Sequence, residues 1–252
     1  MMIKKILFKN IIFNNLDHKS FNNIISKKGL FVFPSGPGIA SLNTNNEYFH
    51  SLKKSDLVFF DSGFFVLLLK FLKNIKVKKF SGYKFLELFF IYLKRNRNKK
   101  VFCIDPNKKF SKSNKIFLKK LGVKKTYHYL APKFNNKNVF DKHLLKMITQ
   151  ARPDFIMTNI GGGIQEILGL YLKKKLKFKV TIICTGGAIS FFTGDQAPIN
   201  SIIDKLYLGW FIRLIFNPLT FSKRYLIALK LIPMVIFNKV VPKNDKRSSK
   251  KL

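Results

Sequence analysis

The sequence predicts an α/β protein with a Rossmann-like parallel sheet sandwiched between helices, and three observations lead to this prediction. Short, almost wholly apolar runs recur along the chain, longer helix-like stretches separate them, and glycine-containing turns follow four of the runs. Alternation of strands and helices implies parallel strands joined by crossover helices. Strands without a polar face are typical of a sheet covered on both sides. With 252 residues, 47% of them hydrophobic, the chain can bury such a core.

Each predicted strand is an apolar run bounded by turn residues. The five strands are LFVFP (30–34), LVFF (57–60), VFCID (101–105), DFIMTN (154–159) and KVTIIC (179–184). The helices predicted around them cover residues 62–75, 83–96, 115–122, 141–151 and 164–176. Apolar residues recur with helical spacing in the last helix, where one side carries Ile164, Ile167, Leu168 and Tyr171.

The pattern changes from Ile199 onward. This stretch is aromatic, aliphatic and basic together, is interrupted by Pro218 and Pro233, and shows no further strand. We therefore expect a core over residues 1–198, a helical, membrane-associating appendage over 199–238, and a disordered basic tail over 239–252. A helical pair that simply packs on the sheet would give the same pattern.

The charge is strongly positive, with 48 Lys and Arg against 12 Asp and Glu, a net charge of +36. AT-rich codon usage explains the lysines better than it explains the scarcity of acids. Such a charge favours anionic partners, which include nucleic acid, an acidic membrane face and phosphorylated substrates. The 15% aromatic content, mostly Phe, favours a membrane over nucleic acid. No zinc-finger spacing or RNP-type motif is present, so we expect no nucleic-acid partner.

The cysteines and histidines do not indicate a metal site. Cys103 and Cys184 lie inside predicted strands, where small buried residues of a reducing compartment are expected. The histidines are scattered without metal-ligand spacing, at positions His18, His50, His128 and His143. The sequence therefore predicts no metal and no cofactor.

No segment reads as a signal peptide or a spanning helix. The N-terminal MMIKKILFKNIIF is basic and apolar but lacks a small-residue cleavage site. The most apolar stretches are interrupted by charged residues, which are Asp61, Lys70, Arg213 and Lys230. None reaches the roughly 20 uncharged residues that a spanning helix needs.

The glycine-containing turns fall where the predicted strands end. They are PSGPGI (34–39), DSG (61–63), GGGIQE (161–166) and TGGAIS (185–190). The carboxyl ends of parallel strands meet at one edge, where helix N-termini suit a diphosphate. No G-x-G-x-x-G or Walker A motif is present. Asp61 ends a strand at this edge, where it fits either a catalytic base or the N-cap of the next helix.

Several motifs resemble those of the WecG/TagA/CpsF family of bacterial glycosyltransferases. SDLVFFDSG resembles the family's A-D-L-V-x-A-D-G, and KKFSGYKFLELF resembles R-V-x-G-x-D-L. The family's G-x-P-x-Q-E turn is matched by Gly161, Gln165 and Glu166. Its G-G-x-F-D-x-x-x-G…R-A-P stretch is matched by Gly186, Gly187, Phe192, Gly194, Ala197 and Pro198, and its G-L-E-W-x-x-R-L…P-x-R…R-Y stretch by Trp210, Arg213, Leu214, Pro218, Arg224 and Tyr225. The resemblance runs from about Leu30 to Ile227.

The resemblance implies an inverting, metal-independent enzyme. Such an enzyme moves a sugar, such as N-acetylmannosamine or its uronate, from a UDP donor to a polyprenyl-diphosphate-linked saccharide. It implies a peripheral protein at an anionic surface, on the cytoplasmic face of the bacterial inner membrane. Asp61 would be the catalytic base. The donor would be held by Ser35, Gly82, Gly161, Gln165, Glu166, Gly186 and Gly187, and the acceptor or diphosphate by Arg213, Lys223 and Arg224.

The sequence also departs from the family's motifs. The T-x-N turn is Phe33-Pro34-Ser35, and Ser62 follows Asp61 where the family has glycine. Two acids of the motifs are replaced by Lys84 and Ser190. The arginine of R-A-P is Gln196, and the glutamate of E-W is Gly209. These changes leave open a catalytically degenerate relative that acts as an assembly partner, beside the basic nucleic-acid-binding protein that the charge alone permits.

Overall fold

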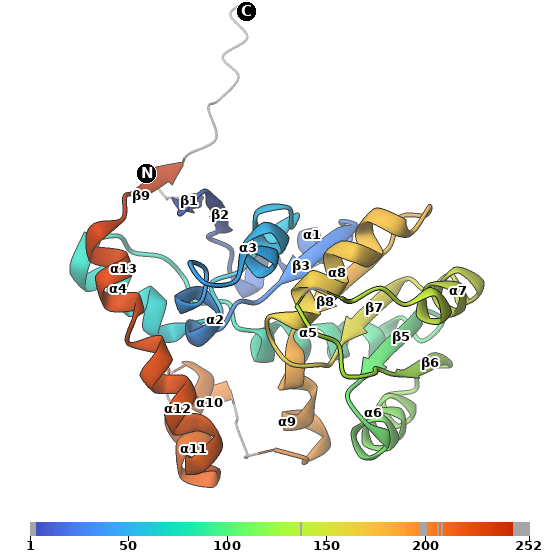
Figure 1. Cartoon of the computed structure of the whole chain (residues 1–252). Helices are drawn as coiled ribbons and strands as arrows, with labels where there is room; N and C mark the ends of the chain where they lie inside the picture. Colours follow the sequence, from blue (N-terminus) through green and yellow to red (C-terminus); the bar gives the residue numbers. More distant parts are fainter. Residues whose placement is uncertain (1–3, 137, 197–200, 206, 208, 244–252) are drawn as a thin grey trace, which may run out of the picture.

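The computed structural model describes residues 4–136, 138–196, 201–205, 207 and 209–243. Its centre is a six-stranded parallel sheet with the strand order β4-β3-β8-β7-β5-β6 (Figure 1). The strands are β3 (Gly29–Val32), β4 (Leu57–Val58), β5 (Lys100–Asp105), β6 (Lys125–Leu130), β7 (Phe155–Thr158) and β8 (Thr181–Cys184). All five predicted strands are present, and the α/β class with a helix-flanked parallel sheet is confirmed.

Helices cover both faces of the sheet. Successive side chains along each strand point to opposite faces, and the helices on each face bury them in two separate hydrophobic cores. Leu30 and Val32 belong to one core and Phe31 to the other. The first core includes residues of α3 (Asn46–Lys53), α4 (Gly63–Lys73), α7 (Lys142–Ala151) and α8 (Ile164–Lys175). The second includes residues of α1 (Phe21–Ile25), α5 (Gly82–Arg95) and α6 (Lys108–Lys120). The five predicted helices are all present, and α6 begins seven residues earlier than expected.

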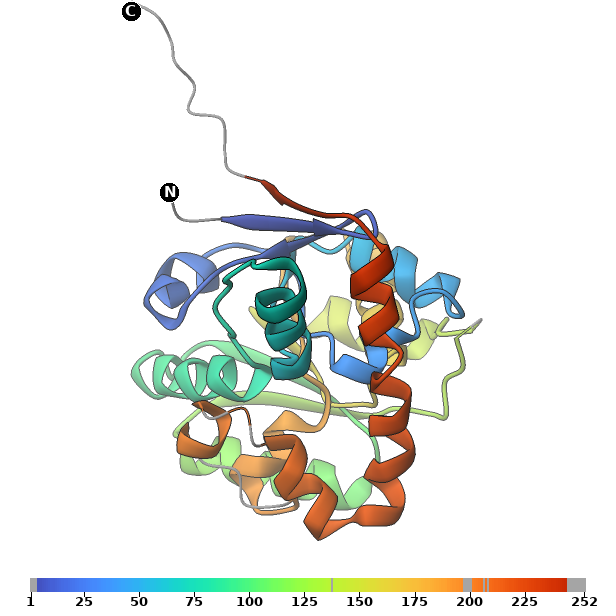
Figure 2. The same ribbon diagram turned by 90° about the vertical axis from the view of Figure 1, so that its left-hand side faces the viewer.

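A second, three-stranded antiparallel sheet joins the two ends of the described chain. Its order is β2-β1-β9, with β1 (Lys5–Phe8), β2 (Ile11–Asn14) and β9 (Val240–Lys243). Lys9 and Asn10 connect β1 and β2 with φ angles of 45° and 59°, as a tight hairpin turn requires. Leu7 pairs with Val241, so the chain returns to its N-terminal strand (Figure 2).

The strand β9 corrects the expectation that no strand follows residue 199. Val240 and Val241 suit a strand, and β1 offers an edge on which they pair. Part of the stretch predicted as a disordered tail is therefore ordered, and residues 244–252 lie outside the described residues.

Helices fill the C-terminal segment before β9. They are α10 (Ser201–Lys205), α11 (Gly209–Phe216), α12 (Pro218–Ala228) and α13 (Leu231–Phe237). α12 packs against α2 (Gly36–Ala40) and α13 against α4. Leu231 and Val235 are fully buried in the first core. The C-terminal helices therefore pack on the core, and they wall one side of the molecule (Figures 1 and 2).

Candidate active site

A cavity of about 650 Å³ opens at the carboxyl edge of the large sheet. The turns after β3, β4, β7 and β8 line it, and α12 contributes to its wall. This is the edge at which open parallel sheets bind ligands. Nine of the predicted site residues line this one cavity, namely Ser35, Asp61, Gly82, Gly161, Gln165, Glu166, Gly186, Gly187 and Arg224. Lys223 is exposed and is not part of the lining, and the side chain of Arg213 lies outside the described residues.

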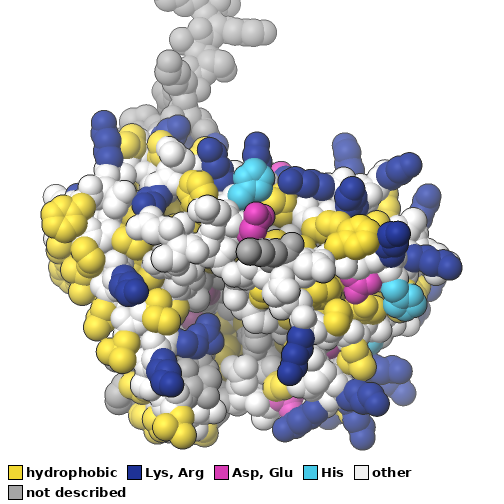
Figure 3. All heavy atoms as spheres, in the orientation of Figure 1, with side chains coloured by type: hydrophobic (Ala, Val, Ile, Leu, Met, Phe, Trp, Pro, Cys, Tyr) yellow, Lys and Arg dark blue, Asp and Glu magenta, His cyan; other side chains and the backbone are white. Residues whose placement is uncertain are grey.

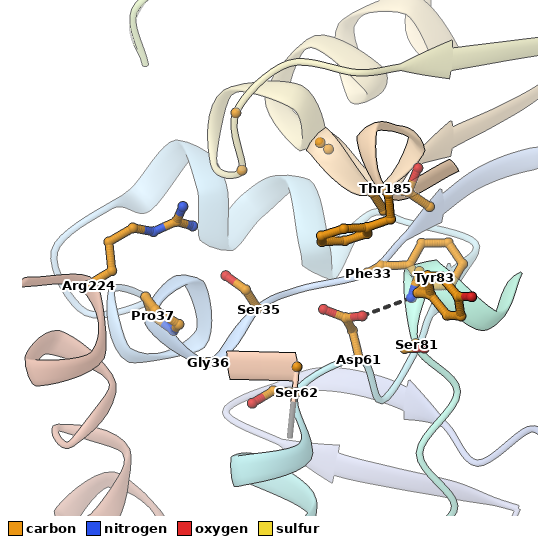
Figure 4. A pocket seen from close by; sticks show the side chains of 18 of the residues that line it. Phe33, Ser35, Gly36, Pro37, Asp61, Ser62, Ser81, Tyr83, Thr185 and Arg224 are labelled. Atoms are coloured by element: carbon orange, nitrogen blue, oxygen red, sulfur yellow. Dashed lines mark hydrogen bonds between the residues drawn. The ribbon is translucent and has the colours of Figure 1, made fainter. Parts of the chain in front are cut away.

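Asp61 follows β4 and reaches across the cavity edge to the start of α5. Its Oδ1 accepts a hydrogen bond of 2.8 Å from the backbone N–H of Gly82 (Figure 4). The neighbouring Ser62 caps α4, because its Oγ accepts a 3.2 Å hydrogen bond from the N–H of Phe65. The N-cap role therefore belongs to Ser62, and Asp61 presents a carboxylate to the cavity.

Gln165 and Glu166 connect the two glycine turns. Gln165 Oε1 accepts a hydrogen bond of 2.6 Å from the N–H of Gly186. Its Nε2 donates to Glu166 Oε1 over 3.0 Å, and Glu166 Oε2 accepts from the N–H of Gly163 over 2.7 Å. Both side chains are almost completely buried. They hold the turns after β7 and β8 in a fixed relation to each other.

Glu166 is coupled electrostatically to Asp61. Burial raises the pKa of Glu166 to about 7, and the charge of Asp61 adds to this effect against the opposing hydrogen bonds from Gly163 and Gln165. Two carboxyl groups therefore share the cavity, and one of them titrates close to neutrality.

The glycine turn before α8 keeps its part of the cavity open. Gly163 has a φ of +93°, which residues with a side chain rarely adopt. A Cβ on Gly161 or Gly162 would meet no atom within 4 Å, so packing alone does not require glycine there. The turn leads into the N-terminus of α8, where the positive end of the helix dipole favours an anion, while the N–H of Gly163 is already paired with Glu166.

Lys79 is a cavity residue that the sequence analysis did not single out. Its Nζ lies 2.7 Å from Asp204 Oδ1 of α10 and 5.1 Å from the centre of the Tyr207 ring. Ser81 Oγ donates to the other Asp204 oxygen over 2.7 Å. Lys79 stands three residues before Gly82, at the arginine position of the R-V-x-G motif, and that alignment could have identified it.

A buried polar network at the other end of the cavity was also missed. Asp105 accepts hydrogen bonds from Asn114 Nδ2 (2.7 Å), Asn159 Nδ2 (2.8 Å) and His128 Nδ1 (2.9 Å). These donors hold the pKa of Asp105 below its usual value although burial opposes them. Cys103, Asp105 and His128 offer metal-ligand atoms within 4.8 Å of one another, because Cys103 and His128 pair across β5 and β6. Two neighbouring strands that are far apart in the sequence supply this cluster, so sequence spacing does not reveal it.

Most of the departures from the family motifs lie around the same cavity. Phe33, Ser190, Gln196 and Gly209 line it, whereas Lys84 does not and pairs with Glu87 within α5. Phe33 stacks on Phe59, with ring centres 4.4 Å apart. Ala197 and Pro198, which match the second motif, lie outside the described residues.

Comparison with known proteins agrees with the motifs. A model of the Glycosyl transferase WecG/TagA/CpsF family matches residues 6–245, which is nearly the whole chain. A relative from Bacillus subtilis (strain 168) is 26% identical over 208 residues, covering 81% of this chain and 78% of the relative. That relative is an N-acetylglucosaminyldiphosphoundecaprenol N-acetyl-beta-D-mannosaminyltransferase.

Proposed function

The chain belongs to the WecG/TagA/CpsF family of glycosyltransferases, and we propose that it moves a hexose from a UDP-sugar to a polyprenyl-diphosphate-linked saccharide. We propose N-acetylmannosamine, its uronate or a related hexose as the sugar. The name of the Bacillus subtilis relative, which describes N-acetylmannosamine transfer to a lipid-linked N-acetylglucosamine diphosphate, supports this choice. The product would serve the assembly of a surface polysaccharide.

One observation carries the proposal: the Asp61 carboxylate and the glycine turn at the N-terminus of α8 line the same cavity. In the proposed reaction, Asp61 takes the proton from the acceptor hydroxyl as its oxygen attacks the anomeric carbon. The bond between that carbon and the UDP oxygen breaks on the opposite face, so the configuration inverts. Lys79 and Arg224, in place of a metal ion, would offset the charge of the leaving UDP.

The C-terminal helices support a peripheral position on the membrane. Ile215, Phe216, Leu219 and Leu226 on α11 and α12 are at least 60% exposed. Figure 3 shows hydrophobic side chains gathered over the C-terminal helices, with lysines and arginines among them. Such a surface suits the boundary of an anionic bilayer. Among the described residues, no helix is both long and apolar enough to span a membrane. We propose the cytoplasmic face of the bacterial inner membrane as the site of action.

The substitution Asp61→Asn tests the mechanism. An asparagine still accepts the hydrogen bond from Gly82 but cannot take a proton, so we expect kcat to fall roughly 10²- to 10⁴-fold. UDP affinity and Tm should stay near their wild-type values. The measurement is transfer of labelled sugar from UDP-N-acetylmannosamine to a short-chain polyprenyl-diphosphate-linked N-acetylglucosamine.

The matched control is Asp17→Asn, which removes a carboxylate that pairs with Lys78 outside the cavity. Its rate should equal that of the wild type. Unchanged turnover in Asp61→Asn would remove Asp61 from the mechanism. A wild-type protein that folds but binds no UDP would instead favour a catalytically degenerate relative that acts as an assembly partner. The departures from the family motifs at Phe33, Ser190, Gln196 and Gly209 agree with that alternative.

A further inference from the structure

Tyr48 on α3 is almost wholly buried, at 1% exposed, yet it belongs to the cavity lining. Its ring packs in the first hydrophobic core. Within the described part of the chain, its hydroxyl forms no hydrogen bond. The hydroxyl oxygen itself is open to the cavity, where it can meet water or a ligand.

The position of the hydroxyl is fixed by α2. A Cβ on Gly38 would lie 2.7 Å from the Tyr48 hydroxyl oxygen and 3.4 Å from Ser35 Oγ. The absence of a side chain at Gly38 therefore makes room for the phenol beside the turn after β3. Ser35 Oγ caps α2 by accepting a hydrogen bond from the N–H of Gly38, so the Ser35 hydroxyl already has a partner in the helix. Tyr48 consequently supplies a second polar group at this end of the cavity.

The surroundings of the phenol are negative. Burial raises the pKa of Tyr48 well above its usual value, and the charges of Glu166 and Asp61 raise it further. The hydroxyl thus stays protonated and acts as a hydrogen-bond donor. A phosphate oxygen beside the Asp61 carboxylate would be repelled, whereas an uncharged sugar oxygen would not. Asp61 also requires the anomeric carbon, and with it the sugar, to lie close by.

We propose that Tyr48 is a substrate-binding residue whose hydroxyl donates a hydrogen bond to an uncharged oxygen of the transferred sugar. This inference rests on the proposed function. It adds a residue that contacts the sugar of the donor and not its nucleotide. The oxygen belongs to a sugar hydroxyl or to an N-acyl carbonyl, which offer the same acceptor chemistry.

The test compares Tyr48→Phe with the wild type in binding UDP, UDP-N-acetylmannosamine and UDP-mannose, by titration calorimetry without acceptor. We expect the variant to bind UDP as the wild type does and UDP-N-acetylmannosamine roughly three- to tenfold more weakly, because one hydrogen bond is lost. An equal loss with UDP-mannose identifies a hydroxyl, and a loss confined to the N-acetyl sugar identifies the carbonyl. Tyr171→Phe, which removes a hydroxyl from the neighbouring α8 outside the cavity, should change none of these affinities.

A second variant displaces the hydroxyl without removing it. In Gly38→Ala, the new Cβ pushes the phenol away, and the same loss of sugar-dependent affinity is expected. Equal weakening of UDP and UDP-sugar in Tyr48→Phe would place the diphosphate there and overturn the inference. Unchanged affinities in a folded Tyr48→Phe would overturn it too, while the proposed function stands as long as the wild type transfers sugar. A wild type that binds no nucleotide overturns both.

Discussion

Glu166 combines complete burial with a position beside the proposed base. Its carboxyl group receives hydrogen bonds from Gly163 and Gln165, and burial together with Asp61 keeps its pKa at about 7. An acid whose pKa is higher in the folded than in the unfolded chain stabilises the fold while it is protonated. That stability is full below its ordinary pKa of 4.5 and is lost as the pH rises through about 7.

We therefore predict that the contribution of Glu166 to stability falls between pH 4.5 and pH 7. The free energy of unfolding of the wild type, relative to that of Glu166→Gln, should drop by roughly 3 kcal/mol from pH 4.5 to pH 8. Urea denaturation of both proteins at each pH measures this difference, and subtraction removes the effect of other titrating groups. A difference that stays constant with pH would contradict the raised pKa.

Several site residues follow from the sequence because strand ends meet at one edge. Asp61, Gly161 and Gly186 each lie within two residues of the end of a predicted strand, and all three line the cavity. Tyr48 and Asp105 follow from no motif. The first depends on how α3 packs beside Gly38, and the second on α6 and two strands that meet around it. Tertiary packing decides such positions, and spacing along the chain does not record it.

At the scale of elements, one glycine of α8 allows the helix to pack closely on the sheet. A Cβ on Gly169 would lie 2.6 Å from Leu30 Cδ1 of β3 and 2.9 Å from Cys184 Sγ of β8. The helix also begins at the turn that Gln165 and Glu166 hold. The close approach at Gly169 therefore fixes how far this turn lies from the sheet.

Gly169→Ala should destabilise the protein although alanine favours a helix. We expect a net loss of up to about 2 kcal/mol, because an overpacking cost of about 1–3 kcal/mol outweighs the gain of about 1 kcal/mol in helix propensity. Gly162→Ala is the control, since its Cβ would meet no atom within 4 Å, and it should change stability by less than about 0.5 kcal/mol. Urea denaturation gives both values. Equal stability of the two variants would show that α8 can move away from the sheet.

The elements that the sequence analysis missed lack the signals of the predicted ones. β6 reads KTYHYL, carries polar residues and lies at the sheet edge, where only one neighbouring strand pairs with it. β1 and β2 are joined at Lys9 and Asn10, which is not a common hairpin dipeptide, and β9 depends on β1 as its partner. Strands that are almost wholly apolar, such as β4 and β8, are predictable, and strands that carry several polar residues or depend on a distant partner are not.

At the scale of the whole molecule, the C-terminal segment is part of the folded unit. Leu231 and Val235 are fully buried, and β9 pairs with β1. Deletion of residues 201–252 should therefore uncover the first core and lower Tm or cause aggregation, measured by thermal unfolding and gel filtration. A truncated protein with the wild-type Tm would show that the core folds without these helices. Membrane binding is better tested by substitutions on the surface.

Phe216→Ser combined with Leu219→Ser tests the proposed membrane contact. These side chains are 62% and 86% exposed, so Tm should not change. Each loses roughly 1 kcal/mol of apolar burial in the bilayer boundary, and binding to phosphatidylglycerol-containing vesicles should weaken at least about tenfold in sedimentation. Phe140→Ser is the control, because Phe140 is 55% exposed and lies between β6 and α7, at the β6 edge of the sheet, whereas the C-terminal helices contact α2 and α4. Added salt should weaken the binding of all three proteins, because the cationic surface contributes. Wild-type affinity in the double variant would locate the membrane contact elsewhere on the molecule.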